Sequence, residues 1–141
     1  MRPEVLRHRL VDLDPHPLAP PATRDPLVDQ RHCEGFALRG AAWRAAGRED
    51  LARRDLAAAW QVLGEDSREF PGRATLRAYV GRALLELSVA AGDAVAARRW
   101  LMIQLGDSEM PEITLEIWRE QPDLQALLGA DTWAELAHAP R

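Results

Sequence analysis

Residues 36–64 read FALRGAAWRAAGREDLARRDLAAAWQVLG, and this stretch decides the fold. Apolar residues recur at helical spacing on both sides of Gly47, and a glycine readily takes the left-handed conformation that ends a helix. The second half carries an apolar stripe from Glu49 to Leu63, before Gly64 ends it. A connection of about two residues between two helices forces them to run antiparallel. The stretch therefore predicts an αα-hairpin.

The first helix of this hairpin has a start signal of its own. Asp25 can cap the helix with its side chain, and Pro26 suits the first helical position, where no backbone donor is needed. We therefore expect this helix to run from Pro26 to Ala46.

The rest of the chain continues the helical pattern and lacks the period-two alternation of a strand. Gly92 and Gly106 are expected to end the third and fourth helices. The expected elements are a third helix from 72–75 to Ala91, a fourth from its cap Asp93 to Leu105, a helix capped by Ser108 and closed at Gln121-Pro122, and short apolar turns at 124–128 and 132–138. The fold class is therefore all-α.

The first 25 residues differ from the rest in composition. Residues 4–12 carry enough apolar side chains for one or two amphipathic turns. Prolines follow at positions 15, 17, 20 and 21, and proline removes a backbone donor and favours extended chain. We therefore expect an N-terminal segment and proline-rich linker over residues 1–25, followed by one helical domain over residues 26–141.

The composition argues against several classes of function. The formal net charge is −4, which disfavours nucleic-acid binding because that binding depends on a surplus of basic residues. Lys and Asn are absent, as in proteins of GC-rich bacterial genomes. No stretch approaches the roughly 18 apolar residues of a membrane span, and the N-terminus lacks the apolar run of a signal peptide. We therefore expect a soluble, cytoplasmic protein that binds neither nucleic acid nor membranes.

The hairpin resembles a tetratricopeptide repeat (TPR). The positions that carry the resemblance are the large residues Phe36, Trp43 and Leu56, the small residues Gly40, Ala52 and Ala59, and Gly47 at the turn. In this pattern the small residues let two helices approach closely, and the large residues fill the space beside them.

A second, weaker copy of the pattern follows about 45 residues later. Gly92, Ala97 and Leu101 repeat the spacing of Gly47, Ala52 and Leu56, whereas Leu85 replaces the glycine of the first helix and Gln104 replaces the second alanine. The resemblance covers about residues 26–138. It implies antiparallel helical hairpins stacked as a short TPR-like α-solenoid.

The resemblance also implies a binding module, whose concave surface is lined mainly by the first helix of each pair. The positions of the first helix that would face this groove are Glu34, Ala37, Ala41, Arg44 and Ala45. Family members that clamp a C-terminal carboxylate use Lys and Asn at such positions, and this chain has neither residue type. We therefore expect another protein or peptide segment as the partner, without a carboxylate clamp.

No arrangement of residues indicates catalysis or a metal site. Cys33 is the only cysteine and lacks the paired Cys or His spacing of a zinc site, so we expect it to be buried and inert. Neighbouring His32 is expected on the surface. The glycines lie mostly at helix ends, and no serine stands in a nucleophile elbow. The chain is therefore predicted to be non-enzymatic, with no cofactor and no metal.

The chain has five tryptophans, a residue type that is enriched at binding hot spots. We expect Trp43, Trp60 and Trp100 to fill gaps between helices. Trp118 and Trp133 lie in the terminal helices, where an exposed apolar face could dock a partner. Such a face could also pair two copies of the chain, so a homodimer is one expected assembly.

Three hypotheses about function follow from the sequence. The leading one is a non-enzymatic adaptor or chaperone-like module that binds a protein segment in a groove between helical pairs. The second is a dedicated secretion chaperone or immunity protein for one toxin or effector. The third, from another class, is a helical enzyme or small-ligand-binding protein with a pocket near His32 and Glu34.

Overall fold

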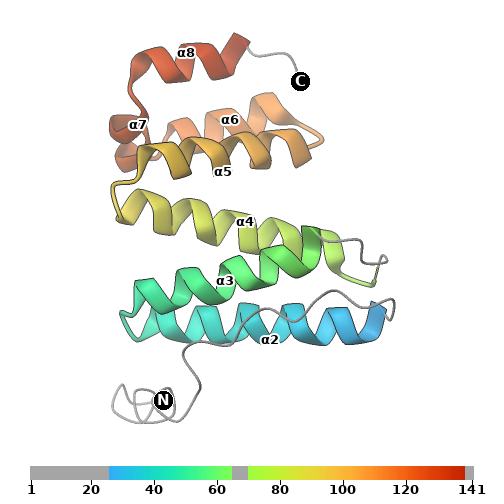
Figure 1. The fold of residues 1–141 in the computed structure, drawn as a ribbon. Helices are drawn as coiled ribbons and strands as arrows, with labels where there is room; N and C mark the ends of the chain where they lie inside the picture. The colour runs from blue at the N-terminus through green and yellow to red at the C-terminus, as the bar shows by residue number, and fades with distance from the viewer. Residues whose placement is uncertain (1–25, 65–69, 139–141) are drawn as a thin grey trace. The chain divides into compact units, whose positions relative to one another are not determined.

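The computed structural model describes residues 26–64 and 70–138, and all regular structure in these ranges is helical (Figure 1). The helices are α2 (Pro26–Ala45), α3 (Glu49–Gly64), α4 (Arg73–Ala90), α5 (Ala94–Asp107), α6 (Pro111–Arg119), α7 (Pro122–Leu128) and α8 (Ala130–His138). The prediction of an all-α fold is confirmed. The predicted segment and linker over residues 1–25 lie outside the described residues, as does the predicted cap Asp25.

The chain divides into two compact units, Met1–Val80 and Gly81–Arg141. The boundary falls inside α4, so the first part of that helix belongs to one unit and the second part to the other. Each unit is described by itself below.

Helices α2 and α3 form the predicted antiparallel hairpin, and they lie side by side in Figure 1. Helix α2 ends at Ala45, one residue before the predicted end, and three residues connect the two helices. Gly47 has a φ of 77°, the left-handed conformation expected at the end of a helix. The backbone N–H of Arg48 donates to the carbonyl oxygen of Trp43 at 2.9 Å and closes the turn.

The small residues of the hairpin are its contact points, as predicted. A Cβ atom added at Gly40 would lie 2.8 Å from Cγ of Leu56 and 3.4 Å from the carbonyl oxygen of Ala52. Ala52 and Ala59 are fully buried. A side chain at position 40 would therefore force the side chain of Leu56 to shift or the two helices to move apart.

A buried ion pair also joins the two helices. Arg39 donates from Nε to Oδ2 of Asp55 at 2.6 Å and from Nη2 to Oδ1 at 2.7 Å. Asp55 is 1% exposed, and its two oxygens match the planar fork of the guanidinium. Because this pair has only one good geometry, it fixes the register of α2 on α3.

The first turns of α4 are held against α3 within the same unit. The guanidinium of Arg73 donates from Nη2 to the carbonyl oxygen of Leu63, near the end of α3. One turn further along, the Cζ atom of Arg77 lies 4.3 Å from the centre of the Trp60 ring. These contacts position the start of α4 for the groove described below.

In the second unit, the turn from α4 to α5 repeats the backbone geometry of the first turn: Gly92 has a φ of 69°, and the backbone N–H of Asp93 donates to the carbonyl oxygen of Ser88 at 3.0 Å. The predicted cap Asp93 also accepts a hydrogen bond from the backbone N–H of Ala96 at 3.0 Å, a cap that Arg48 at the matching position of the first turn cannot provide. Ala97 and Leu101 are fully buried, and their counterparts Ala52 and Leu56 are at most 1% exposed.

Two predictions about the end of α5 are wrong. Gly106 does not end the helix, which continues to Asp107, because this glycine keeps a right-handed φ. Ser108 caps the C-terminus of α5 and is not the N-cap of α6, a place taken by Met110. The reason is Pro111, whose fixed φ and missing N–H suit the first helical position.

The two predicted apolar turns at the end of the chain are the helices α7 and α8. Their buried side chains are Leu124, Trp133 and Leu136. Trp133 is therefore part of the core and offers no exposed docking face, whereas Trp118 in α6 is half-buried. Trp43 and Trp100 are buried and Trp60 is half-buried, in agreement with their predicted role between helices.

Candidate functional site

A groove opens between α2 and the first part of α4 in the first unit. Its lining residues are Glu34, Ala37, Leu38 and Ala41 from α2 and Thr75, Leu76 and Tyr79 from α4, and its volume is about 390 Å³. The four residues of α2 stand at positions i, i+3, i+4 and i+7, a pattern that places them on one face of a helix. Three of the five predicted groove residues are therefore brought together: Glu34, Ala37 and Ala41.

The walls of this groove are mainly apolar, and its floor is made of small side chains. Ala37 is only 4% exposed, so it lies at the bottom, whereas Leu38 is 72% exposed and Tyr79 is 46% exposed at the rim. Alanine on one helix leaves room for a side chain from elsewhere. An apolar side chain that entered this space would contact alanine methyl groups below and Leu38 or Tyr79 beside it.

One carboxylate gives the groove a fixed negative charge. Gln30 donates from Nε2 to Oε1 of Glu34 at 2.9 Å, and the two residues are one helical turn apart. Glu34 is half-buried, so its charge is partly shielded from water. A ligand with a basic residue next to its apolar side chain would complement this arrangement.

The other two predicted groove residues do not line the groove. Arg44 and Ala45 are both exposed at the C-terminal end of α2, beyond Ala41. Sequence reasoning also missed four residues of the lining: Leu38, Thr75, Leu76 and Tyr79. Leu38 was detectable as an exposed apolar residue in the same stripe, but the α4 residues depend on how that helix packs.

Cys33 is fully buried, as predicted, and its thiol donates to the carbonyl oxygen of Ala59 at 3.8 Å. Burial is the main cause that raises the pKa of Cys33 to about 11, and the neighbouring charge of Glu34 adds to it. The thiolate is therefore scarce at neutral pH, and Cys33 is a poor nucleophile.

His32 is half-buried rather than on the surface, and its Nδ1 atom is buried with no partner among the described residues. His32 and Glu34 are two positions apart, so they face different sides of α2. His32 does not line the groove. The sequence-based hypothesis of one pocket near both residues therefore gains no support from this geometry.

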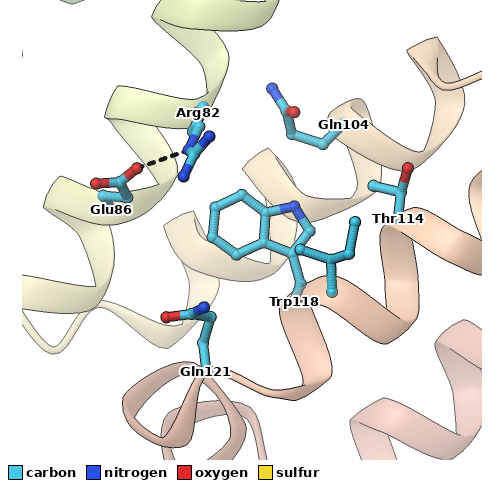
Figure 2. Close-up of a pocket in the computed structure, with 7 residues that line it drawn as sticks. Arg82, Glu86, Gln104, Thr114, Trp118 and Gln121 are labelled. Carbon is cyan, nitrogen blue, oxygen red and sulfur yellow. Dashed lines mark hydrogen bonds and ion pairs between the residues drawn. The ribbon is translucent and has the colours of Figure 1, made fainter.

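A second pocket, of about 350 Å³, lies within the second unit (Figure 2). It is lined by Arg82 and Glu86 of α4, Gln104 of α5, Thr114, Ile117 and Trp118 of α6, and Gln121. Sequence reasoning did not find this pocket. Its one signal was Gln104, a polar residue where the repeat pattern expects a small one.

An ion pair and an indole ring dominate the second pocket. Arg82 donates from Nε to Oε1 of Glu86 at 3.0 Å, and its Cζ atom lies 5.8 Å from the centre of the Trp118 ring. Figure 2 shows the indole of Trp118 projecting toward Arg82, with Gln104 and Gln121 on either side. This pocket is thus more polar than the groove of the first unit.

Two further observations concern other kinds of site. Within residues 26–64 and 70–138, no three His, Cys, Asp or Glu side chains come together in a way that could hold a metal ion. In the same ranges, every helix is too short or too polar to cross a membrane.

Comparison with protein-family models, with curated proteins and with solved structures found no match to this chain. The two pockets are therefore the basis on which function can be inferred.

Proposed function

We propose that this chain is a non-enzymatic, cytoplasmic protein-interaction module of the TPR-like kind, an adaptor or a chaperone. It binds a segment of another protein in the groove between α2 and α4. The observation that carries the proposal is the position of Glu34, Ala37 and Ala41, which the repeat pattern assigns to the groove and which line one together.

The TPR-like part of the proposal is supported by the two turns of the chain. Gly47 and Gly92 both have a positive φ, and both are followed at the same spacing by a buried alanine and a buried leucine. In the first hairpin, a Cβ atom added at Gly40 would lie only 2.8 Å from Cγ of Leu56. Close contact at small residues is the packing on which stacked helical pairs depend.

The groove favours a segment with one apolar anchor and a nearby basic residue. Burial of one Leu-sized side chain against Ala37 and Ala41 contributes roughly 1.5–3 kcal/mol. Such an anchor alone gives weak binding, because association costs several kcal/mol. The partner therefore needs further contacts, for which the rim residues Leu38 and Tyr79 and the carboxylate of Glu34 are available.

A pair of matched variants tests the proposal. Leu38 and Val95 are both exposed apolar residues on helices, at 72% and 83%, but only Leu38 lines the groove. Proteins captured from a lysate by the full chain are identified by mass spectrometry, and the affinity of each purified candidate is measured by calorimetry. We expect Leu38→Asp to weaken binding of the true partner roughly 5- to 150-fold, which corresponds to the loss of about 1–3 kcal/mol at a contact.

Val95→Asp is the control and should bind as the unchanged chain does. Equal binding by both variants would place the partner elsewhere and contradict the proposal. Saturable binding of a metabolite, with no protein partner that responds to Leu38→Asp, would also contradict it.

A further inference from the structure

The second pocket has hydrogen-bonding groups that make no bond to the residues the structure describes. Among the described residues, none accepts a hydrogen bond from Nε1 of Trp118 or from the Nη1 and Nη2 groups of Arg82. The side-chain amide of Gln121 likewise has no partner in those residues. All three side chains line the same pocket. The pocket therefore offers several donors to a ligand.

The charge of the pocket is balanced by its own ion pair. Glu86 holds Nε of Arg82 at 3.0 Å, and both side chains line the pocket. A second carboxylate brought to Arg82 would meet the charge of Glu86, and a basic group would meet the guanidinium. The pocket therefore favours an uncharged ligand that is rich in acceptors.

The pocket also has an apolar wall. Trp118 is half-buried, and Ile117 beside it is exposed although both residues line the pocket. An indole with a free N–H provides an apolar surface and a donor next to one another. A ligand that matches both must alternate small apolar groups with carbonyl oxygens.

A proline-rich segment has this chemistry. Proline has no backbone N–H, so a run of prolines presents carbonyl acceptors and apolar rings but no donors. Such a run is preformed as a polyproline II helix, and it loses little entropy on binding to an aromatic groove. We propose that the pocket formed by α4, α5 and α6 is a binding site for a proline-rich segment of a protein in the polyproline II conformation.

Other peptide conformations fit this pocket less well. The N–H groups of a β-strand require acceptors, and the one charged acceptor that lines the pocket, Glu86, already accepts from Arg82. An α-helical ligand has its carbonyl groups bonded within the helix, so they are not free for Trp118 or Arg82. This site is separate from the groove between α2 and α4, and neither proposal depends on the other.

The test uses the full chain, labelled with ¹⁵N, and an acetylated and amidated oligoproline of about ten residues as the probe. We expect the indole N–H resonance of Trp118, assigned from its absence in Trp118→Phe, to shift and saturate during the titration. Trp118→Phe keeps an aromatic ring but removes one hydrogen bond, so we expect the affinity to fall roughly two- to tenfold. Arg82→Gln should have an effect of the same size.

Arg98→Gln is the matched control. Arg98 is also an exposed arginine of this unit and is paired with a glutamate, Glu135, at 3.1 Å, but it does not line the pocket. The affinity of Arg98→Gln for oligoproline should equal that of the unchanged chain. Far-UV circular dichroism establishes that each variant is as helical as the unchanged chain, and the amides of Ile117 and Gln121 report binding in the Phe variant.

Three results would overturn the proposal. The first is an unmoved Trp118 indole resonance at millimolar oligoproline. The second is equally tight binding of a Gly–Ser peptide of the same length. The third is tighter binding of an acidic peptide with an affinity that falls as salt rises, because this would make the pocket an anion site.

Discussion

The helix pairs α2–α3 and α4–α5 are each joined by a turn with a left-handed glycine. They differ in the side chains at matching positions of their helices. In the first, α2 presents Gly40 to Leu56, and a buried ion pair stands beside this contact. About 45 residues later, the position of Gly40 is held by Leu85, which is fully buried. A turn with a left-handed glycine is thus compatible with a close helix contact in one case and a bulky apolar side chain in the other.

The ion pair shows the same contrast more strongly. The positions that correspond to Arg39 and Asp55 are Leu84 and Trp100 in the second unit, and both are buried and apolar. A buried ion pair adds little net stability over apolar residues of similar size, because both charges lose their water. It does add specificity, since a pair with one good geometry penalises every other register. We infer that the first hairpin uses its ion pair to hold α2, and with it the groove residues, in one register on α3.

The largest expected effect comes from breaking this pair. Arg39→Leu leaves the Asp55 carboxylate buried and without its bidentate partner, so we expect a loss of about 3–5 kcal/mol in the free energy of unfolding. The double variant Arg39→Leu with Asp55→Leu imitates the second unit and should recover most of that loss. Urea denaturation of both variants measures the difference. Equal stability of Arg39→Leu and the unchanged chain would show that the pair is not needed.

A smaller effect tests the close contact. Gly40→Ala and Gly35→Ala change the same residue type within α2, but an added Cβ meets nothing within 4 Å at Gly35 and lies 2.8 Å from Leu56 at Gly40. The helix propensity gained is about the same at both positions, so it cancels in the comparison. We expect Gly40→Ala to be about 1–3 kcal/mol less stable than Gly35→Ala. Thermal unfolding of the two variants compares them directly, and equal midpoints would argue against a close contact.

An effect that is absent at neutral pH concerns the Cys33 thiol. The folded chain keeps the proton of Cys33 up to a pKa of about 11, whereas an unfolded chain releases it near the ordinary value of about 8.5. Unfolding therefore releases a proton between these values, and stability should fall as pH rises through this window, by up to about 1.4 kcal/mol per pH unit. Below pH 8 both states hold the proton, and the effect should vanish. Cys33→Ala should lose this part of the pH dependence, and an unchanged profile would show that the thiol titrates normally.

Much of the fold could be predicted because its signals are local. Gly47, Gly92 and Asp93 each decide a turn or a cap from their own chemistry and that of their neighbours. The end of α5 could not be predicted in this way, because a glycine such as Gly106 is compatible with a helix as well as with its end. The helix ends at Asp107, and Pro111 begins the next helix four residues later.

The candidate sites were only partly predictable. Glu34, Ala37 and Ala41 followed from the repeat resemblance, because they belong to one face of one helix. Leu76 and Tyr79 could not be assigned, since their position in the groove depends on the packing of α4 within the first unit. The ion pair of Arg39 with Asp55 joins residues 16 positions apart on different helices, and no spacing rule predicts such a pair.

The most direct measurement of the proposed function is the footprint of a bound partner segment on the ¹⁵N-labelled chain. If the groove between α2 and α4 is the binding site, the largest shifts of backbone amides should occur at Ala37, Ala41 and Leu76, and they should need a higher concentration of the segment in Leu38→Asp. Shifts confined to residues outside the groove, with these three amides unmoved, would contradict the proposed function.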